Sequence, residues 1–246
     1  MNDHIHESWT ANNLLRLLSV EDLSLLRPHF QRWTGPAGTV IYEPGDNVRF
    51  AYFPCGSSMI SFTVMMQDGR NVETGLVGRE GVAGGIVSNG SLPSFSRMSV
   101  QEGDAFLRID SHQLEDIKMR SPSIRHLFAR YADCLVAQIF QSVACNAVHT
   151  IEQRTSRWIL AAVDRTGRDH VRMTQDELAE MLGVGRSYVN RVLKSLQSEG
   201  IIETRRGGFI VRDVGALQRS ACECTDAIRR HFNEVLQGAY PNGRTQ

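Results

Sequence analysis

One stretch of the chain, TQDELAEMLGVGRSYVNRVLKSL at residues 174–196, constrains the fold more than any other. Thr174 followed by Glu177 forms a capping box, which satisfies free backbone amides at the start of a helix. Gly183 and Gly185 then interrupt the helical spacing and predict a tight turn. The predicted buried positions on the two sides of this turn are Leu178, Met181, Leu182, Val189, Val192, Leu193 and Leu196. The stretch therefore predicts two short helices joined by a glycine turn.

The second predicted helix, from Arg186 to about Ser198, has polar residues on the arc that its apolar residues leave free. In a helix-turn-helix, the N-terminal residues of the second helix meet base edges in the major groove of DNA. A guanidinium group there can donate two hydrogen bonds to guanine. The pattern therefore indicates a nucleic-acid-binding unit rather than a plain helical hairpin.

The next segment, IIETRRGGFIVRD at residues 201–213, predicts two short strands around an arginine-containing turn. Such a hairpin beside a helix-turn-helix is typical of a wing that lies against the phosphate backbone. We therefore predict a winged helix-turn-helix that contacts DNA through the following residues: Thr174, Arg186, Ser187, Tyr188, Asn190, Arg191, Lys194, Arg205 and Arg206.

The formal net charge is zero, but the charges are unevenly distributed along the chain. Residues 1–110 hold 8 Lys/Arg against 12 Asp/Glu, a balance of −4, whereas residues 165–212 hold 9 against 6, a balance of +3. The hydrophobic fraction of 41% in 246 residues suits two compact domains. No signal-peptide run and no apolar run of membrane-spanning length occurs, so we expect a cytoplasmic protein.

The five cysteines are odd in number and scattered, without a Cys-x-x-Cys pair. This spacing favours neither a disulfide framework nor a zinc knuckle, and we expect reduced thiols and no metal site. Cys224 shares helical spacing with Leu217, Ala221 and Ile228 on one predicted C-terminal helix, and is expected to lie in the core.

The N-terminal part predicts an antiparallel β-structure after two short amphipathic turns. The strand-like runs GTVIYE, FAYFPCG, SMISFTVMM and AFLRI are separated by the turn sequences EPGD and QDGRN. Many short strands with such turns indicate a barrel, β-roll or jelly roll. The fold class is therefore α+β.

A long helix is predicted between the two parts, over residues 123–148. Ser121 is its expected N-cap and Pro122 its first residue. Its apolar stripe is wide enough to bury against two surfaces, one of which we expect to be a second copy of the helix. The alternative is that both surfaces belong to one chain. The residues proposed for dimerisation are Ile124, Phe128, Tyr131, Leu135, Ile139 and Phe140, with Leu127, Val136 and Val143 on the adjoining phase.

In this order of parts the chain resembles the Crp/Fnr superfamily of bacterial transcription regulators, over roughly residues 12–237. The resemblance implies a cyclic-nucleotide-binding-like β-roll in residues 1–122, a dimerisation helix in 123–148 and a winged helix-turn-helix in 149–246. It implies a homodimer on a palindromic double-stranded DNA operator, and RNA polymerase as a further partner. The effector is left open.

The recognition helix departs from the family pattern at one position. Arg186 and Arg191 occupy the family's two arginine positions, whereas Ser187 stands where glutamate is usual. Serine both donates and accepts hydrogen bonds and is too short to reach a base edge except through water. We therefore expect weaker discrimination at that base pair, and expect Arg186 to lack an acidic partner.

The sensor region also departs from the family pattern. The resemblance places the Gly-Glu pair that binds ribose near Ala83 and Gly84, and the phosphate-binding arginine near Ser94. On the long helix, the polar pair that would face adenine falls at Ile139 and Phe140. Cyclic AMP control is therefore not expected, and Arg79, Glu80 and Arg97 are interpreted as surface residues.

No cofactor is predicted. The N-terminus lacks the cysteine cluster of iron-sulfur members, and His149, His126 or Cys55 are the candidates for an axial haem ligand. No phosphate loop or nucleophile elbow indicates an enzyme. The alternative interpretation is a ligand- or haem-binding sensor module whose helix-turn-helix serves a different output.

Overall fold

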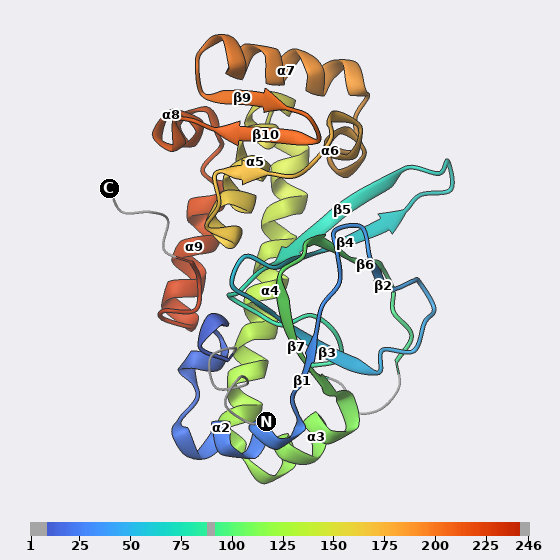
Figure 1. Cartoon of the computed structure of the whole chain (residues 1–246), viewed down its shortest axis with the longest axis vertical. Helices are drawn as coiled ribbons and strands as arrows, with labels where there is room; N and C mark the ends of the chain where they lie inside the picture. Colours follow the sequence, from blue (N-terminus) through green and yellow to red (C-terminus); the bar gives the residue numbers. More distant parts are fainter. Residues whose placement is uncertain (1–8, 88–91, 242–246) are drawn as a thin grey trace.

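The computed structural model describes residues 9–87 and 92–241. It has a β-structure at one end, a long helix that runs along the molecule, and a helical unit with a small sheet at the other end (Figure 1). This arrangement confirms the predicted α+β class, with an N-terminal antiparallel β-roll and a C-terminal winged helix-turn-helix. No helix among the described residues is long and apolar enough to cross a membrane.

Two antiparallel sheets form the β-roll. One has the strand order β1-β7-β3 and the other β2-β6-β4-β5. Their bounds are β1 (Gln31–Trp33), β2 (Val40–Tyr42), β3 (Phe50–Cys55), β4 (Met59–Met65), β5 (Asn71–Val77), β6 (Arg97–Glu102) and β7 (Ala105–Asp110). Gly45 and Gly69 have φ angles of +92° and +84°, as the predicted turns between strands require.

The sequence patterns predicted only part of this β-roll. Strands β2, β3, β4 and β7 correspond to the four apolar runs, whereas β1, β5 and β6 are rich in polar and charged residues and were not predicted. The helix α3 (Ser111–Arg120), capped by Asp110, was also missed. The remaining N-terminal turns of helix are η1 (Trp9–Ala11), η2 (Leu15–Leu17), α2 (Val20–Leu26) and η3 (Arg27–His29).

The long helix α4 (Pro122–Val148) confirms the predicted helix and its start. The Ser121 hydroxyl accepts a hydrogen bond from the Ile124 amide at 3.2 Å, and Pro122 occupies the first turn, where it needs no amide partner. Twenty-seven residues at the helical rise give a rod about 40 Å long. The helix therefore connects both ends of the molecule (Figure 1).

The structure corrects the assignment of dimerisation residues on α4. Ile124, Phe128 and Tyr131 are at most 1% exposed, because they pack in the core of their own chain. Their neighbours there belong to the β-roll and to the C-terminal segment, residues 224–241. These three residues are therefore not available to a partner. Leu135 is partly buried, whereas the exposed apolar residues lie further along the helix: Val136, Ile139, Phe140 and Val143.

The C-terminal unit begins with α5 (Ile151–Thr166), which Thr150 caps and Gly167 ends. It continues with β8 (His170–Val171), α6 (Gln175–Leu182), α7 (Arg186–Ser198), β9 (Ile202–Arg205), β10 (Gly208–Val211), α8 (Val214–Ser220) and α9 (Cys224–Val235). The three strands form a sheet in the order β8-β10-β9. The predicted single C-terminal helix is wrong, because residues 221–223 separate α8 from α9.

Helix α9 lies along α4 and carries the chain back towards the β-roll (Figure 1). Phe232 packs edge to face with Tyr131 of α4, at a ring-centroid distance of 6.4 Å. Cys224 is fully buried at the start of α9, as predicted. The helical unit and the β-roll are thus held together by a helix that follows the helix-turn-helix in sequence.

Candidate nucleic-acid interface

The first helix of the predicted pair starts and ends as its residues dictate. The Thr174 hydroxyl accepts from the Glu177 amide at 3.2 Å, and the Glu177 carboxylate accepts from the Thr174 amide at 2.7 Å. Gly183 ends α6 with a φ angle of +68°, in the left-handed region where a side chain is strained. The capping box and the glycine turn are therefore both confirmed.

The second helix, α7, presents its polar arc to solvent at the outer end of the molecule (Figure 1). Its buried residues are those predicted, Val189, Val192, Leu193 and Leu196. The candidate contact residues Arg186, Ser187, Tyr188, Arg191 and Lys194 are exposed, and Asn190 is half-buried. The helix thus offers a continuous surface of donors beside a packed apolar face.

Two arginines of α7 have partners that the sequence did not predict. Arg186 Nη1 lies 3.1 Å from Asp176 Oδ2 of α6, which corrects the expectation that Arg186 lacks an acidic partner. The Arg191 guanidinium lies 5.2 Å from the centroid of the Tyr188 ring. Both side chains are thereby held at the helix surface, where exposed pairs of this kind are weak enough to exchange partners.

The predicted wing is a hairpin of β9 and β10. Gly207 occupies its turn with a φ angle of +77°, and Arg205 and Arg206 are exposed at this end. Arg205 forms an ion pair with Glu203, which Arg212 also contacts. Hydrogen bonding from Arg212 and the nearby positive charges lower the pKa of the Glu203 carboxyl.

A pocket of about 400 Å³ opens between the β-roll and α4. Ala83, Gly84 and Ser94, which the family resemblance assigned to ligand binding, all line it. The long helix contributes Ala132, Leu135 and Val136 instead of the expected Ile139 and Phe140, which are exposed. None of the described residues that line the pocket is charged.

The three charges interpreted as surface residues differ in their surroundings. Arg97 lies 2.9 Å from Glu43, at the surface. Arg79 is half-buried. Glu80 is only 1% exposed, so its assignment to the surface is wrong. Its carboxylate is buried because a cation from a distant part of the sequence reaches it.

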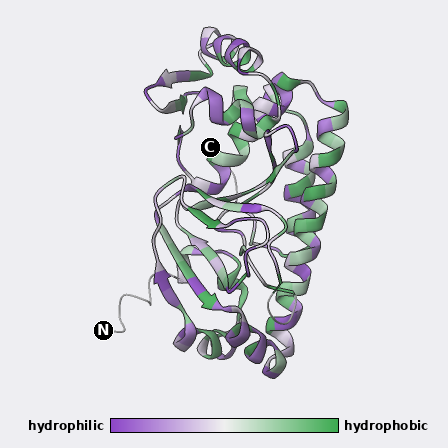
Figure 2. Cartoon of the chain, turned by 90° about the vertical axis from the view of Figure 1, so that its right-hand side faces the viewer, coloured by the Kyte–Doolittle hydropathy of each residue, from purple (hydrophilic) through white to green (hydrophobic). Residues whose placement is uncertain are grey.

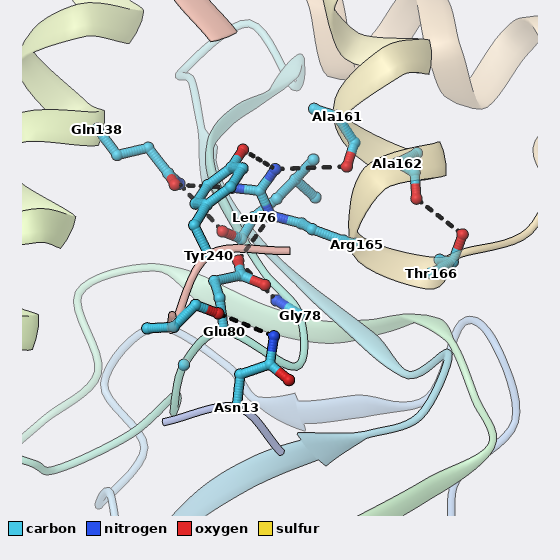
Figure 3. Close-up of polar contacts among 12 residues, drawn as sticks. Asn13, Leu76, Gly78, Glu80, Gln138, Ala161, Ala162, Arg165, Thr166 and Tyr240 are labelled. Atoms are coloured by element: carbon cyan, nitrogen blue, oxygen red, sulfur yellow. Dashed lines mark hydrogen bonds and ion pairs between the residues drawn. The ribbon is translucent and has the colours of Figure 1, made fainter. Parts of the chain in front are cut away.

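That cation is Arg165, at the end of α5, whose Nε donates to Glu80 Oε1 at 2.7 Å. Figure 3 shows the Arg165 guanidinium between Glu80, Gln138 and Tyr240, to which it donates at 2.7, 2.9 and 3.3 Å respectively. Gln138 in turn donates to the carbonyl of Leu76 at 3.0 Å. This network joins the β-roll, α4, α5 and the C-terminal segment.

A second contact between the two ends involves Glu73 of β5. Its carboxylate accepts from Trp158 Nε1 of α5 at 2.7 Å. Burial raises the pKa of the Glu73 carboxyl to about 7, against the opposing effects of the Trp158 hydrogen bond and of the charges of Arg157 and Arg165. Because the pKa of Glu73 is higher in the folded protein than in the unfolded chain, Glu73 lowers the free energy of unfolding as pH rises from the ordinary carboxyl range to about 7.

The histidine and cysteine candidates for haem ligation lie in different surroundings. His126 is exposed near the start of α4, and Cys55 is buried in the β-roll, where burial raises the pKa of its thiol to about 12. His149, at the end of α4, lies beside cysteines that the sequence separates. Three of the five cysteines that are scattered along the sequence, Cys145, Cys222 and Cys224, form one buried cluster.

Comparison with known proteins identifies a domain family for one part of the chain. Residues 153–220 match the Crp-like helix-turn-helix domain family. No curated protein matches the chain significantly.

Other solved structures share the fold over most of the chain, and the following three are among them. The c-di-GMP-responsive global regulator CLP of Xanthomonas campestris is 18% identical, with a TM-score of 0.64 and coverage of 79% of this chain and 100% of that one. FixK2 of Bradyrhizobium japonicum is 14% identical, with a TM-score of 0.66 and coverage of 78% and 98%. A CRP-family transcriptional regulator of Thermus thermophilus is 20% identical, with a TM-score of 0.64 and coverage of 78% and 96%.

Proposed function

We propose that this chain, which has a Crp-like helix-turn-helix domain at residues 153–220 on the fold of Crp/Fnr regulators, is a sequence-specific DNA-binding transcription regulator. The observation that carries the proposal is the exposed basic arc of α7 beside the arginine-bearing turn of the wing. A surface of this kind matches the width and donor-acceptor pattern of the major groove.

The two parts of this surface have different roles in the proposal. Arg186 and Arg191 read bases, with Ser187, Tyr188, Asn190 and Lys194 beside them on α7. Thr174, Arg205 and Arg206 contact phosphates, because they lie at a helix start and on the wing rather than on the groove-facing arc. Asp176 holds Arg186 in the unbound protein and releases it, or shares it, when guanine accepts.

We further propose a homodimer on a palindromic operator, with RNA polymerase as a further partner. The exposed apolar residues in the second half of α4 support a partner helix at that face. A two-fold axis along α4 places two recognition helices about 34 Å apart on successive turns of DNA. The chain then divides as proposed, into a sensor part at 1–122, a dimerisation helix at 123–148 and a DNA-binding part at 149–246.

The proposal is tested by selecting bound sequences from a random pool of duplex DNA and measuring their affinity beside scrambled controls. A regulator of this type should enrich an inverted repeat and bind it at least about 1,000-fold more tightly than scrambled DNA. Equal affinity for selected and scrambled duplexes would refute it.

Arg191→Ala and Arg206→Ala should impair binding in different ways. Loss of a bidentate arginine–guanine contact should weaken binding by about 5- to 150-fold for each half-site of the operator and relax the preference at one base pair there. Loss of the wing arginine should weaken all sequences alike and reduce the slope of log affinity against log salt by about 0.9 for each phosphate contact. Gel-shift titrations over a range of salt concentrations measure both effects.

Arg219→Ala is the matched control, because it removes an exposed arginine of α8 that lies on neither α7 nor the wing. It should leave both base preference and salt slope unchanged. If Arg191→Ala weakened specific and scrambled DNA by the same factor, Arg191 would not be reading a base.

Cyclic AMP and cyclic GMP should leave DNA affinity unchanged. The pocket at the expected ligand position has no charged side chain among its described lining residues, and an unpaired phosphate is costly to bury. Calorimetry with either nucleotide should show no saturable binding at micromolar concentrations. Saturable micromolar binding that changes operator affinity would contradict this part of the proposal.

A further inference from the structure

Four side chains from two segments that are far apart in the sequence meet where α4 ends. Cys145 lies in the last turn of α4, His149 caps that helix, and Cys222 and Cys224 flank the start of α9. One ligand atom from each side chain lies within 4.8 Å of all the others. The three cysteines are almost fully buried, at 0%, 6% and 0% exposure. All four residues lie outside the segment that matches the helix-turn-helix family.

Two of the separations between these ligand atoms match a single tetrahedral centre. Cys145 Sγ lies 3.6 Å from Cys222 Sγ, and Cys224 Sγ lies 3.5 Å from His149 Nδ1. For a zinc ion with bonds of about 2.3 Å to sulfur and about 2.05 Å to nitrogen, tetrahedral angles place two sulfurs about 3.8 Å apart, and a sulfur and a nitrogen about 3.6 Å apart. The quartet therefore needs only small shifts to coordinate one ion.

A second set of contacts orients the ligands. His149 Nε2 lies 3.3 Å from Glu223 Oε2, which leaves Nδ1 directed at the cysteines. A carboxylate on the far nitrogen of a ligating histidine is the usual arrangement at zinc sites, since it fixes the ring and makes it a better donor. Gln141 Nε2 donates to Cys224 Sγ at 3.1 Å, a hydrogen bond that suits a thiolate.

The surrounding charge also suits a thiolate-rich site. Three thiolates and a neutral imidazole around a divalent ion have a net charge of 2 − 3 = −1. Arg157 interacts electrostatically with Cys145, and Arg154 with Cys145 and Cys222. The Nε atoms of both arginines are buried without a hydrogen-bond partner among the described residues. The positive charges of Arg154 and Arg157 can therefore offset the net negative charge of the bound ion and its ligands.

We propose that Cys145, His149, Cys222 and Cys224 form a binding site for one tetrahedrally coordinated divalent ion of the zinc class. Three sulfurs and one nitrogen are a donor set that zinc prefers, and four protein ligands in a buried site make it structural. A cluster of several irons fits less well, because its terminal ligands are divided among two or more iron atoms and therefore lie further apart than the ligands of one ion.

The ion would join two segments that are far apart in the sequence, the end of α4 with His149 and the residues at the start of α9. His149 lies two residues before α5, the first helix of the DNA-binding part, while Cys222 lies between α8 and α9 and Cys224 is the first residue of α9. Binding would therefore fix the direction in which the helix-turn-helix leaves α4. This consequence for DNA binding rests on the proposed function, whereas the metal site does not.

The first test is metal analysis of the full chain purified without chelators. We expect about one zinc per chain by mass spectrometry of the metal, and less than a tenth of that in Cys222→Ser. Cys134→Ser is the matched control, because Cys134 is equally buried but lies elsewhere on α4 and should retain the full zinc content. Equal zinc in the two variants would overturn the proposal.

A second measurement does not depend on variants that fold. Cobalt added to the metal-free wild-type chain should give the strong visible bands of a tetrahedral ion and a thiolate-to-cobalt charge-transfer band, saturating at one equivalent. Glu223→Gln should weaken cobalt and zinc affinity by about 10- to 100-fold, as loss of a partner on the ligating histidine does elsewhere. No zinc and no cobalt bands, with a Cys145–Cys222 disulfide instead, would refute the site.

The two proposals can fail separately. Zinc at one equivalent with no operator binding would leave the metal site intact and refute the regulator. Sequence-specific DNA binding by a chain with no zinc or cobalt site would do the reverse.

Discussion

Arg165→Met is expected to lower the free energy of unfolding by about 3–5 kcal/mol, because it leaves the Glu80 carboxylate buried without its cation. Arg165 and Glu80 are 3% and 1% exposed, so water can replace little of the lost interaction. The substitution also removes the donors to Gln138 and Tyr240. Denaturant unfolding followed by tryptophan fluorescence measures the loss.

The double variant Arg165→Met with Glu80→Gln should be more stable than Arg165→Met alone by about 2 kcal/mol, because no unpaired charge then remains in the core. This result would distinguish loss of the ion pair from loss of side-chain packing as the cause of the lower stability of Arg165→Met. It also provides a variant that folds if Arg165→Met does not.

Arg168→Met is the matched control for this prediction. Arg168 Nη1 lies 3.2 Å from Glu102, but its side chain is 41% exposed, so the pair should contribute less than about 1 kcal/mol. If Arg165→Met and Arg168→Met reduced stability equally, burial would not be what makes the Arg165–Glu80 pair important. That pair joins the β-roll to α5, so its loss should also loosen the contact between the two ends.

The parts of the fold that the sequence predicted are those that local chemistry determines. The capping box at Thr174, the left-handed Gly183 and the Ser121-Pro122 helix start each act within a few residues, and all three are confirmed. Strands such as β5, with Glu73 and Gly75 inside, have no comparable local signal. The conformation of β5, an edge strand, is set by its pairing with β4 in the sheet.

The sequence patterns could not predict contacts between residues that are far apart in the sequence. Glu80 and Arg165 are 85 positions apart, and Cys145 and Cys222 are 77 apart. Spacing rules for metal sites depend on ligands at short, fixed separations in the sequence, and they say nothing of ligands that the fold brings together from two distant segments. A single sequence therefore gave no reason to group these cysteines, although their residue types are those of a zinc site.

The long helix shows a third limit of periodicity. The apolar stripe predicted which side of α4 is buried. It did not predict which part of the helix packs in the core of its own chain. The first half, from Ile124 to Tyr131, is covered by the β-roll and the C-terminal segment. Only the second half is left for another surface, and Figure 2 shows α4 at the edge of the molecule with hydrophobic residues along this part.

Phe140→Glu is therefore expected to convert the proposed dimer into a monomer. Phe140 is 70% exposed at the centre of an apolar face formed with Val136, Ile139 and Val143, which are 45%, 47% and 65% exposed. These residues recur at three- and four-residue steps and so lie on one side of the helix. At a two-fold axis each glutamate would meet its own copy, so two negative charges would be buried together. Sedimentation at micromolar concentration measures the change.

The loss of dimerisation should appear again in DNA binding, with a pattern that misfolding cannot produce. Affinity for an operator with two half-sites should fall by about 100- to 10,000-fold, because the second recognition helix no longer binds as part of the same molecule. Affinity for a single half-site should not change, since α7 and the wing are untouched. Met119→Glu, at a 69% exposed position on α3, should leave both affinities and the dimer as they are. A Phe140→Glu chain that remains dimeric with full operator affinity would show that this face of α4 is not the interface, and that the recognition helices are paired by another surface.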